Sequence, residues 1–110
     1  MMRVGIMLRS GDVVLARVHF TDTFEIKTRP CLVLYEEFDN IVIAGITSNL
    51  RMEGIPLSKE DGADRNCVIK LNYIFTIHRS MATMRLFHLN KKKKEIVYKK
   101  LNDYLKKLVE

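Results

Sequence analysis

Short apolar runs separated by tight polar segments are the feature of this sequence that most constrains its fold. The runs are rich in aliphatic and β-branched residues, which is typical of strands covered on one or both faces. They are residues 13–20, 30–35, 41–46, 67–69 and 74–77, with residues 55–57 as a possible short edge strand. About five short strands with tight connections predict a mainly β fold, a small barrel.

The C-terminal segment follows a different period. Asn90 is a suitable N-cap, and apolar residues recur after it at helical spacing. These residues are Val97, Leu101, Tyr104, Leu105 and Leu108. We expect a single domain over residues 1–110, with the barrel at about 10–89. An amphipathic helix at about 91–109 would pack its apolar stripe on the barrel.

Positive charge is concentrated at the C-terminal end of the chain. The formal net charge is +6, yet residues 91–110 alone contain eight lysines and three acidic residues, a net of +5. Residues 91–94 are all lysine and fall in the first helical turn, where the helix macrodipole disfavours cations. The sequence shows no local gain from this placement. We interpret the lysines as a solvated face, since basicity alone does not establish an anionic partner.

Length and composition limit the classes of protein open to this chain. It has 110 residues, of which 47% are hydrophobic, enough for one modest core. No apolar run approaches the roughly 18 residues of a membrane span, and the N-terminal segment lacks a secretory pattern. Cys31 and Cys67 lie in separate apolar runs, and no cluster of His, Cys, Asp or Glu has ligand spacing. We expect a soluble, cytoplasmic protein with reduced thiols and no metal or cofactor.

Arg29 is the residue that the strand pattern explains least. It stands with Pro30 directly before the apolar residues 31–34, in the segment TRPCLVL. Proline is tolerated at the first position of a strand, because its missing N–H costs least there. A guanidinium, however, is always charged and carries five donors. One interpretation is that Arg29 pairs with Asp22 or Glu25 and braces the preceding loop.

Four segments of the sequence form an ordered set of landmarks: GDVVLARVHFTD, KTRPCLVL, IAGITSN and CVIKLNYIFTI. They contain a glycine-acid pair opening the first strand, an F-T-D loop and an R-P before the second strand. A T-S pair then ends the third strand, and an F-T-I lies in a late strand. In this order and at these separations, the chain resembles the MazF/PemK toxin endoribonucleases over residues 10 to about 108.

The resemblance implies an SH3-like barrel of the CcdB/MazF type with an appended C-terminal helix, in agreement with the strand pattern. Members of this family act as dimers that cut single-stranded RNA, and each is silenced by the tail of an antitoxin. For this chain the resemblance therefore implies an mRNA interferase, the toxin of a toxin-antitoxin pair. Its partners would be single-stranded RNA, an antitoxin tail in the RNA groove and a second copy of the chain, and no membrane.

The same resemblance assigns two catalytic residues. The arginine of the family's R-P pair falls on Arg29, and the threonine that ends the third strand falls on Thr47. Metal-free cleavage uses the 2′-hydroxyl of the RNA as nucleophile and leaves a cyclic phosphate and a free 5′-hydroxyl. An arginine fork bonds two phosphate oxygens at once, and a threonine hydroxyl can donate to one. With the family pattern we favour a phosphate clamp over a loop brace for Arg29.

The general base has two candidates. Glu25 lies just before Arg29, near a position where the family often carries an acidic residue. His19 titrates near neutrality, although it can also be an ordinary histidine at a strand end. The residues expected to contact RNA are Lys27, Thr28, Ser48, Asn49, Lys70 and Asn72.

Two of these positions depart from part of the family. Some members carry an arginine and an aspartate where this chain has Lys70 and Asn72. Lysine keeps the positive charge, but asparagine cannot take a proton, so activity would be low if that aspartate were essential. Two alternatives follow: a non-catalytic, CcdB-like toxin that binds DNA gyrase, or a decayed relative that binds RNA without cutting it. The presence of Arg29 and Thr47 argues against gyrase binding.

The expected homodimer has one candidate interface in the sequence. Apolar residues gather in the late segment 81–89, where Met81, Met84, Leu86 and Phe87 lie close together. They can supply a subunit interface, or they can cover the floor of the barrel. The sequence leaves both interpretations open.

Overall fold

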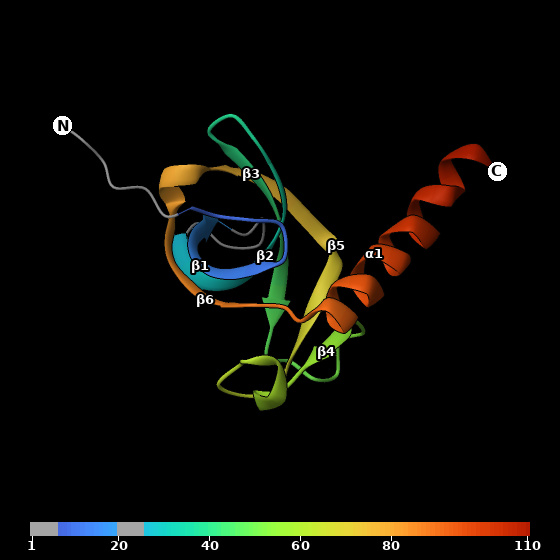
Figure 1. The fold of residues 1–110 in the computed structure, drawn as a ribbon, viewed down its shortest axis with the longest axis horizontal. Helices are drawn as coiled ribbons and strands as arrows, with labels where there is room; N and C mark the ends of the chain where they lie inside the picture. Colours follow the sequence, from blue (N-terminus) through green and yellow to red (C-terminus); the bar gives the residue numbers. More distant parts are fainter. Residues whose placement is uncertain (1–6, 20–25) are drawn as a thin grey trace.

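Residues 7–19 and 26–110 are described by the structure, a computed structural model. The elements are β1 (Asp12–His19), β2 (Ile26–Glu37), β3 (Asn40–Thr47), β4 (Ile55–Leu57), η1 (Lys59–Asp61), β5 (Cys67–His78), η2 (Arg79–Met81), β6 (Ala82–His88), α1 (Lys91–Leu105) and η3 (Lys106–Val109). The strands form one antiparallel sheet in the order β4-β5-β3-β2-β1-β6. The sheet curls into a half-barrel, and α1 follows its last strand (Figure 1). The predicted mainly β fold with a C-terminal helix is confirmed.

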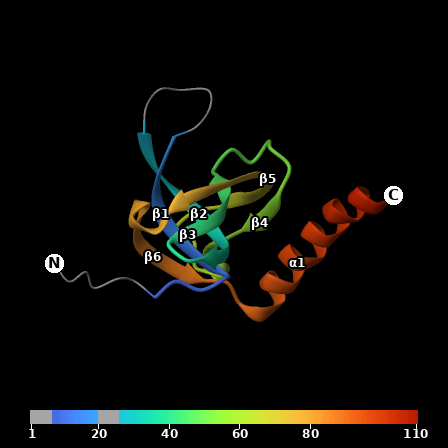
Figure 2. The same cartoon turned by 90° about the horizontal axis from the view of Figure 1, so that it is seen from above.

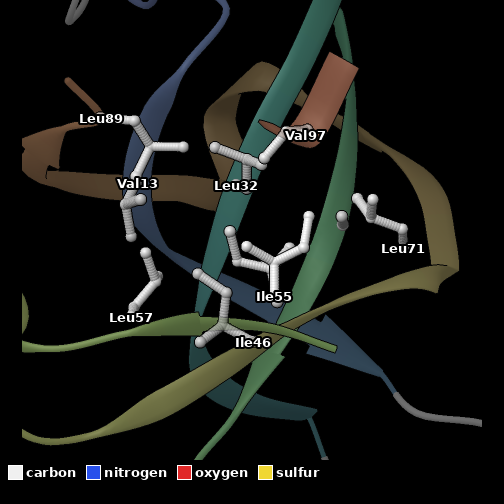
Figure 3. Close-up of a cluster of buried hydrophobic side chains, with 10 residues drawn as sticks. Val13, Leu32, Ile46, Ile55, Leu57, Leu71, Leu89 and Val97 are labelled. Atoms are coloured by element: carbon white, nitrogen blue, oxygen red, sulfur yellow. The ribbon is translucent and has the colours of Figure 1, made fainter. Parts of the chain in front are cut away.

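The core lies on both faces of the curled sheet, because alternate residues of a strand point to opposite faces. On β1, Val13 belongs to a cluster that also contains Leu32 and Val97 of the helix, whereas Val14 belongs to a second cluster with Cys31. Figure 3 shows the first cluster, in which side chains from the sheet, β4 and α1 meet. Strands β1, β2 and β3 contribute buried residues to both clusters, so they are held from two sides, which fixes their register.

Strand β2 is longer than the sequence indicates. The apolar run predicts a strand at 30–35, but β2 already begins at Ile26 and pairs with the end of β1. Lys27 lies opposite Val18, and Thr28 lies opposite Arg17. Backbone pairing across the hairpin overrides the polar composition of these residues. Arg29 is therefore held within a strand, and the proposed loop brace through Asp22 or Glu25 lies outside the described residues.

The two predicted strands at 67–69 and 74–77 are one strand, β5. Its pairing with β3 shifts register, because Gly45 lies opposite Lys70 while its neighbour Ala44 lies opposite Ile74. Residues 71–73 are the extra residues of an irregularity in a continuous strand, which explains why the sequence pattern appears interrupted there. The sequence analysis also left β6 unassigned. This strand pairs with β1, forms one edge of the sheet and is largely exposed.

The helix begins as predicted, since the Asn90 side chain accepts a hydrogen bond from the Lys93 amide at 2.8 Å. It ends as α1 at Leu105, and η3 continues to Val109. The prediction that its whole apolar stripe packs on the barrel is wrong. Among the helix residues only Val97 is buried, and α1 leads away from the sheet toward the C-terminus (Figure 2).

Two lysines of the first helical turn have structural partners, which the sequence did not reveal. The Lys93 ammonium donates to the Pro56 carbonyl of β4 at 2.8 Å and lies 3.8 Å from the Asp61 carboxylate. The Lys94 ammonium lies 3.0 Å from Nε2 of His88. These contacts join the start of α1 to both edges of the sheet. Lys93 and Lys94 therefore have local partners that offset the unfavourable macrodipole, and the interpretation of a purely solvated face is wrong for them.

Candidate functional site

Arg29 lines a pocket of about 450 Å³, which we call the Arg29 pocket. Two other residues that the sequence analysis assigned to RNA contact, Thr28 and Ser48, line the same pocket. Its floor is apolar and comes from several strands. The floor residues are Val13, Leu15, Pro30, Ile46, Leu57, Leu86 and Phe87. A positive side chain thus stands beside an apolar surface.

The pairing of β2 with β3 ends at Cys31 opposite Gly45, two residues from Arg29 on one strand and from Thr47 on the other. Thr47 pairs with Val68 of β5 and is not among the residues that line the Arg29 pocket. The Thr47 hydroxyl oxygen accepts a hydrogen bond from the Asn49 amide at 3.1 Å. A hydroxyl that accepts a bond still carries its own hydrogen, which can donate to a phosphate oxygen. The turn at Asn49 thereby fixes where that hydroxyl lies.

A loop from residue 58 to 66 forms the opposite wall of the pocket. Gly62 has a φ of +113°, and a Cβ at this position would come within 2.7 Å of Phe87. Only glycine combines this backbone conformation with so close an approach. The Asp61 carboxylate accepts a bond from the Ser58 amide at 2.8 Å, and Lys93 faces the same carboxylate from the helix. These contacts at Asp61 hold the wall of the pocket in place.

This loop contributes two charged residues that the sequence analysis did not select. Asp64 and Arg65 line the pocket, with the Arg65 guanidinium 3.7 Å from the Asp64 carboxylate. Both side chains are largely exposed at the rim. The sequence showed them only as members of a charged loop, because their position depends on how Gly62 packs against Phe87. Arg65 is thus a second guanidinium beside the Arg29 pocket.

The two cysteines are unsuited to nucleophilic chemistry. Cys67 lines the pocket, but burial, together with the carboxylates of Asp64 and Asp61, raises the pKa of its thiol. Burial raises the pKa of Cys31 to about 12. A thiol must lose its proton to act as a nucleophile, so neither cysteine is activated. Both are free thiols, in agreement with the expectation from the sequence.

Lys70 and Asn72 do not reach the Arg29 pocket. Both line a different groove of about 880 Å³, between β5 and the helix. Lys70 is only 8% exposed, and its ammonium donates to the Glu53 carbonyl. In this structure the Lys70 ammonium holds the loop at Glu53, and the expectation that Lys70 and Asn72 contact RNA stays a prediction.

Of the two candidates for the general base, the structure describes only His19, which is set apart from the Arg29 pocket. His19 lies at the exposed end of β1, opposite Ile26, and lines a third pocket of about 830 Å³ with Asn72 and His78. None of the described residues of the Arg29 pocket is a histidine or glutamate. Glu25 lies outside the described residues, so its place relative to Arg29 is not given by the structure.

The fold and this pocket define a class: a small half-barrel with a pocket that is lined by two arginines and by apolar side chains. In sequence, residues 9–105 match the family described as PemK-like, MazF-like toxin of type II toxin-antitoxin system. The chain belongs to this family. Comparison with curated protein sequences gives no match.

Solved structures share the fold at low sequence identity. The Mycobacterium tuberculosis toxin MazF-mt6 superposes with a TM-score of 0.71 and 19% identity, covering 86% of this chain and 96% of that one. A structure described as an Mtb toxin gives a TM-score of 0.65 and 17% identity, covering 84% and 97%. These likenesses establish the MazF-like fold.

Among residues 7–19 and 26–110, no group of three or more His, Cys, Asp or Glu side chains is placed to hold a metal ion. Likewise, none of the helices there combines the length and apolar character needed to cross a membrane.

Proposed function

We propose that this type II toxin is an endoribonuclease that cleaves single-stranded RNA without a metal ion. The observation that carries the proposal is that Arg29, Thr28 and Ser48 line one pocket in a chain of the MazF/PemK family. Single-stranded RNA offers both a phosphate for a guanidinium and unstacked bases for an apolar surface. The pocket supplies both partners side by side.

In the proposed reaction, the 2′-oxygen of a ribose attacks the adjacent phosphorus after a base removes its proton. The bond from phosphorus to the next 5′-oxygen breaks, and that oxygen takes up a proton. The products are a 2′,3′-cyclic phosphate and a free 5′-hydroxyl. Arg29 would neutralise charge on the phosphate oxygens, and Thr47 would donate to one of them. Glu25 is the better candidate base, because His19 lines a separate pocket.

Metal independence gives the first test. Purified protein should cleave a single-stranded RNA in the presence of EDTA, since the nucleophile belongs to the RNA itself. Products with a 5′-hydroxyl should accept label from polynucleotide kinase without prior phosphatase treatment. An Arg29→Ala preparation made in the same way controls for a contaminating ribonuclease. Activity that EDTA abolishes and magnesium or zinc restores would contradict the proposal.

If the wild-type chain leaves RNA intact, the remaining alternatives become distinguishable. Retained RNA binding would identify a decayed relative, and capture of DNA gyrase without RNA binding would identify a CcdB-like toxin. Membership of a type II family implies a protein antitoxin as partner. We propose that its tail occupies the Arg29 pocket, and that the toxin acts in the cytoplasm, where mRNA lies.

We also propose that the chain forms a homodimer through β6. This strand is an edge of the sheet, and it exposes Met84 by 53% and Leu86 by 42%. An edge strand with exposed apolar side chains is a ready site for association. Light scattering at micromolar concentration should give twice the 12.9 kDa mass of the chain. Met84→Lys should shift it to the single mass, and a wild-type monomer would refute the dimer.

A further inference from the structure

An aspartate and an arginine stand side by side at the rim of the Arg29 pocket. Asp64 and Arg65 both line the pocket, and Nε of Arg65 lies 3.7 Å from the Asp64 carboxylate. Their side chains are 86% and 72% exposed, and an ion pair so exposed contributes little to folding. A carboxylate is also unfavourable beside a site for phosphate, because like charges repel. Neither folding nor phosphate binding therefore explains Asp64.

The backbone on both sides of this pair is anchored to the core. Ala63 packs against the first buried cluster, and its amide donates to the Ser58 carbonyl at 3.2 Å. Cys67, the first residue of β5, packs against the same cluster and pairs with Leu57 of β4. Residues 64–66 are exposed between these two anchors. The two charged groups are thus presented to the pocket from a backbone that is held in place.

The pair places acceptor oxygens next to parallel donors. A carboxylate can accept from two neighbouring N–H groups, and a guanidinium can donate to two neighbouring acceptors. Among the RNA bases, only guanine carries both patterns on adjoining edges, with N1–H and the N2 amino group next to the acceptors O6 and N7. Uracil matches in part, because its single N3–H lies between two carbonyl oxygens. Adenine and cytosine would turn a bare ring nitrogen toward the carboxylate, which repels it.

The rest of the pocket suits the ring and the phosphate of a nucleotide. The side chains of Leu86 and Phe87 from β6 line it, and an apolar surface of this kind favours an unstacked base. Arg29, the proposed phosphate clamp, lines the same pocket. A base that reaches Asp64 and Arg65 therefore lies close to the phosphate that Arg29 holds.

We propose that Asp64 and Arg65 recognise a guanine of single-stranded RNA, so that cleavage falls beside this base. The carboxylate accepts from N1–H and from the N2 amino group, and the guanidinium donates to O6 and N7. Such recognition rests on the proposed function, because RNA must enter the Arg29 pocket. Asp64 and Arg65 then set the specificity, and Arg29 acts on the phosphate.

Binding measures the base preference without cleavage. The probes are fluorescein-labelled 2′-fluoro oligoadenosines, which lack the attacking hydroxyl, with guanine or adenine at the central position. Fluorescence anisotropy with the wild-type chain should show tighter binding of the guanine probe by roughly tenfold or more, the discrimination typical of a good bidentate contact. A probe with inosine, which lacks only the N2 amino group, should fall between the two. Asp64→Asn should bring the ratio of the two affinities close to one.

The ratio of affinities isolates the contact with the base from general attraction for RNA. Removal of a negative charge strengthens the binding of any RNA, so Asp64→Asn should raise both affinities while it removes their difference. Asp103→Asn makes the same change of charge at an exposed residue of α1 that does not line the Arg29 pocket, and it should leave the ratio intact. Arg65→Gln should lower the ratio, because it removes the donors to O6 and N7.

Cleavage separates a failure of guanine recognition from a failure of the proposed function. Fragments of a random-sequence RNA should end with guanine beside the broken bond. Cleavage without a base preference would overturn guanine recognition and leave the ribonuclease in place. Intact RNA together with a guanine preference in binding would support the recognition and refute the ribonuclease. Equal binding of the guanine and adenine probes by the wild type, or an unchanged ratio in Asp64→Asn, would also overturn the recognition.

Discussion

Replacing Arg29 with alanine should lower the rate of RNA cleavage by about a hundred- to a thousand-fold and leave the melting temperature nearly unchanged. A preorganised donor to developing charge in a transition state is typically worth this much in rate. The side chain is exposed on β2, where an ion pair contributes only about 0–1 kcal/mol to folding. Single-turnover cleavage with excess protein and a thermal melt monitored by circular dichroism measure the two quantities.

Lys106→Ala is the control for the loss of one positive charge by itself. Lys106 lies in η3, beyond the end of α1, and lines none of the pockets described above. This variant should cleave at close to the wild-type rate. If Arg29→Ala unfolds the protein, or cleaves RNA as fast as the wild type, Arg29 is a structural brace and the site assignment fails.

Two further variants separate geometry from charge. Arg29→Lys should recover little activity, because a point charge cannot reproduce the bidentate contact of a guanidinium. Thr47→Val keeps the shape of the side chain and removes the hydroxyl, so it should cause a smaller loss than Arg29→Ala. Full activity of Arg29→Lys would show that the residue acts only through long-range attraction for RNA.

The sequence predicted those strands whose side chains alternate between two buried clusters. The strands β1 and β3 contain β-branched residues that fill both faces of the curled sheet, so their pattern is strong. The start of β2 was missed because Lys27 and Thr28 are polar and are ordered only by pairing with β1. β6 was missed because its side chains are mostly exposed, which removes the contrast between a buried and a solvated face.

The candidate site was predictable only where chain neighbours remain neighbours in space. Arg29, Thr28 and Ser48 line one pocket because β2 and β3 are neighbouring strands of the sheet. Asn72 is one of the extra residues of β5, an irregularity that has no clear mark in the sequence, and it lines a different groove. Arg65 could not be found at all, because its place at the pocket depends on the left-handed Gly62 and on its contact with Phe87.

The second large effect concerns Asp12, whose role the sequence did not reveal. This side chain is fully buried, and its carboxylate lies 2.7 Å from Nδ1 of His88 and 3.5 Å from the Arg85 guanidinium. It also accepts a bond from the Arg9 amide at 2.8 Å. The Lys94 ammonium can only donate, so Nε2 of His88 accepts its hydrogen and Nδ1 donates to Asp12. One carboxylate thereby links β1, β6 and the first turn of α1.

The pKa of Asp12 shows that the folded state favours its charged form. Burial alone would raise this pKa, but the bonds from His88 and Arg9 and the charge of Arg85 outweigh burial and hold it below its usual value. A carboxyl group with a lowered pKa stabilises the fold above its unfolded pKa of about 3.9. That stabilisation is lost as the pH falls through the lower, folded pKa. The fold should therefore weaken below about pH 4.

We expect Asp12→Asn to lower the free energy of unfolding by about 1–3 kcal/mol at pH 7. Between pH 4 and pH 3, the free energy of unfolding of this variant should decrease less steeply than that of the wild type. Asparagine removes the charge and directs an amide N–H toward a group that is itself a donor. Urea denaturation at these pH values measures both effects. Asp64→Asn is the matched control, because that side chain is 86% exposed and should change stability by less than about 0.5 kcal/mol.

The position of Asp12 also predicts that RNA cleavage should survive the substitution of this residue. Asp12 does not line the Arg29 pocket, so Asp12→Asn should still cleave RNA at temperatures well below its melting point. Arg29→Ala should show the reverse, a stable fold with little cleavage. If Asp12→Asn matches the wild type in stability at pH 7 and in its acid response, the network does not hold the helix to the sheet. The two variants thus separate the residues that build the half-barrel from those that act on its substrate.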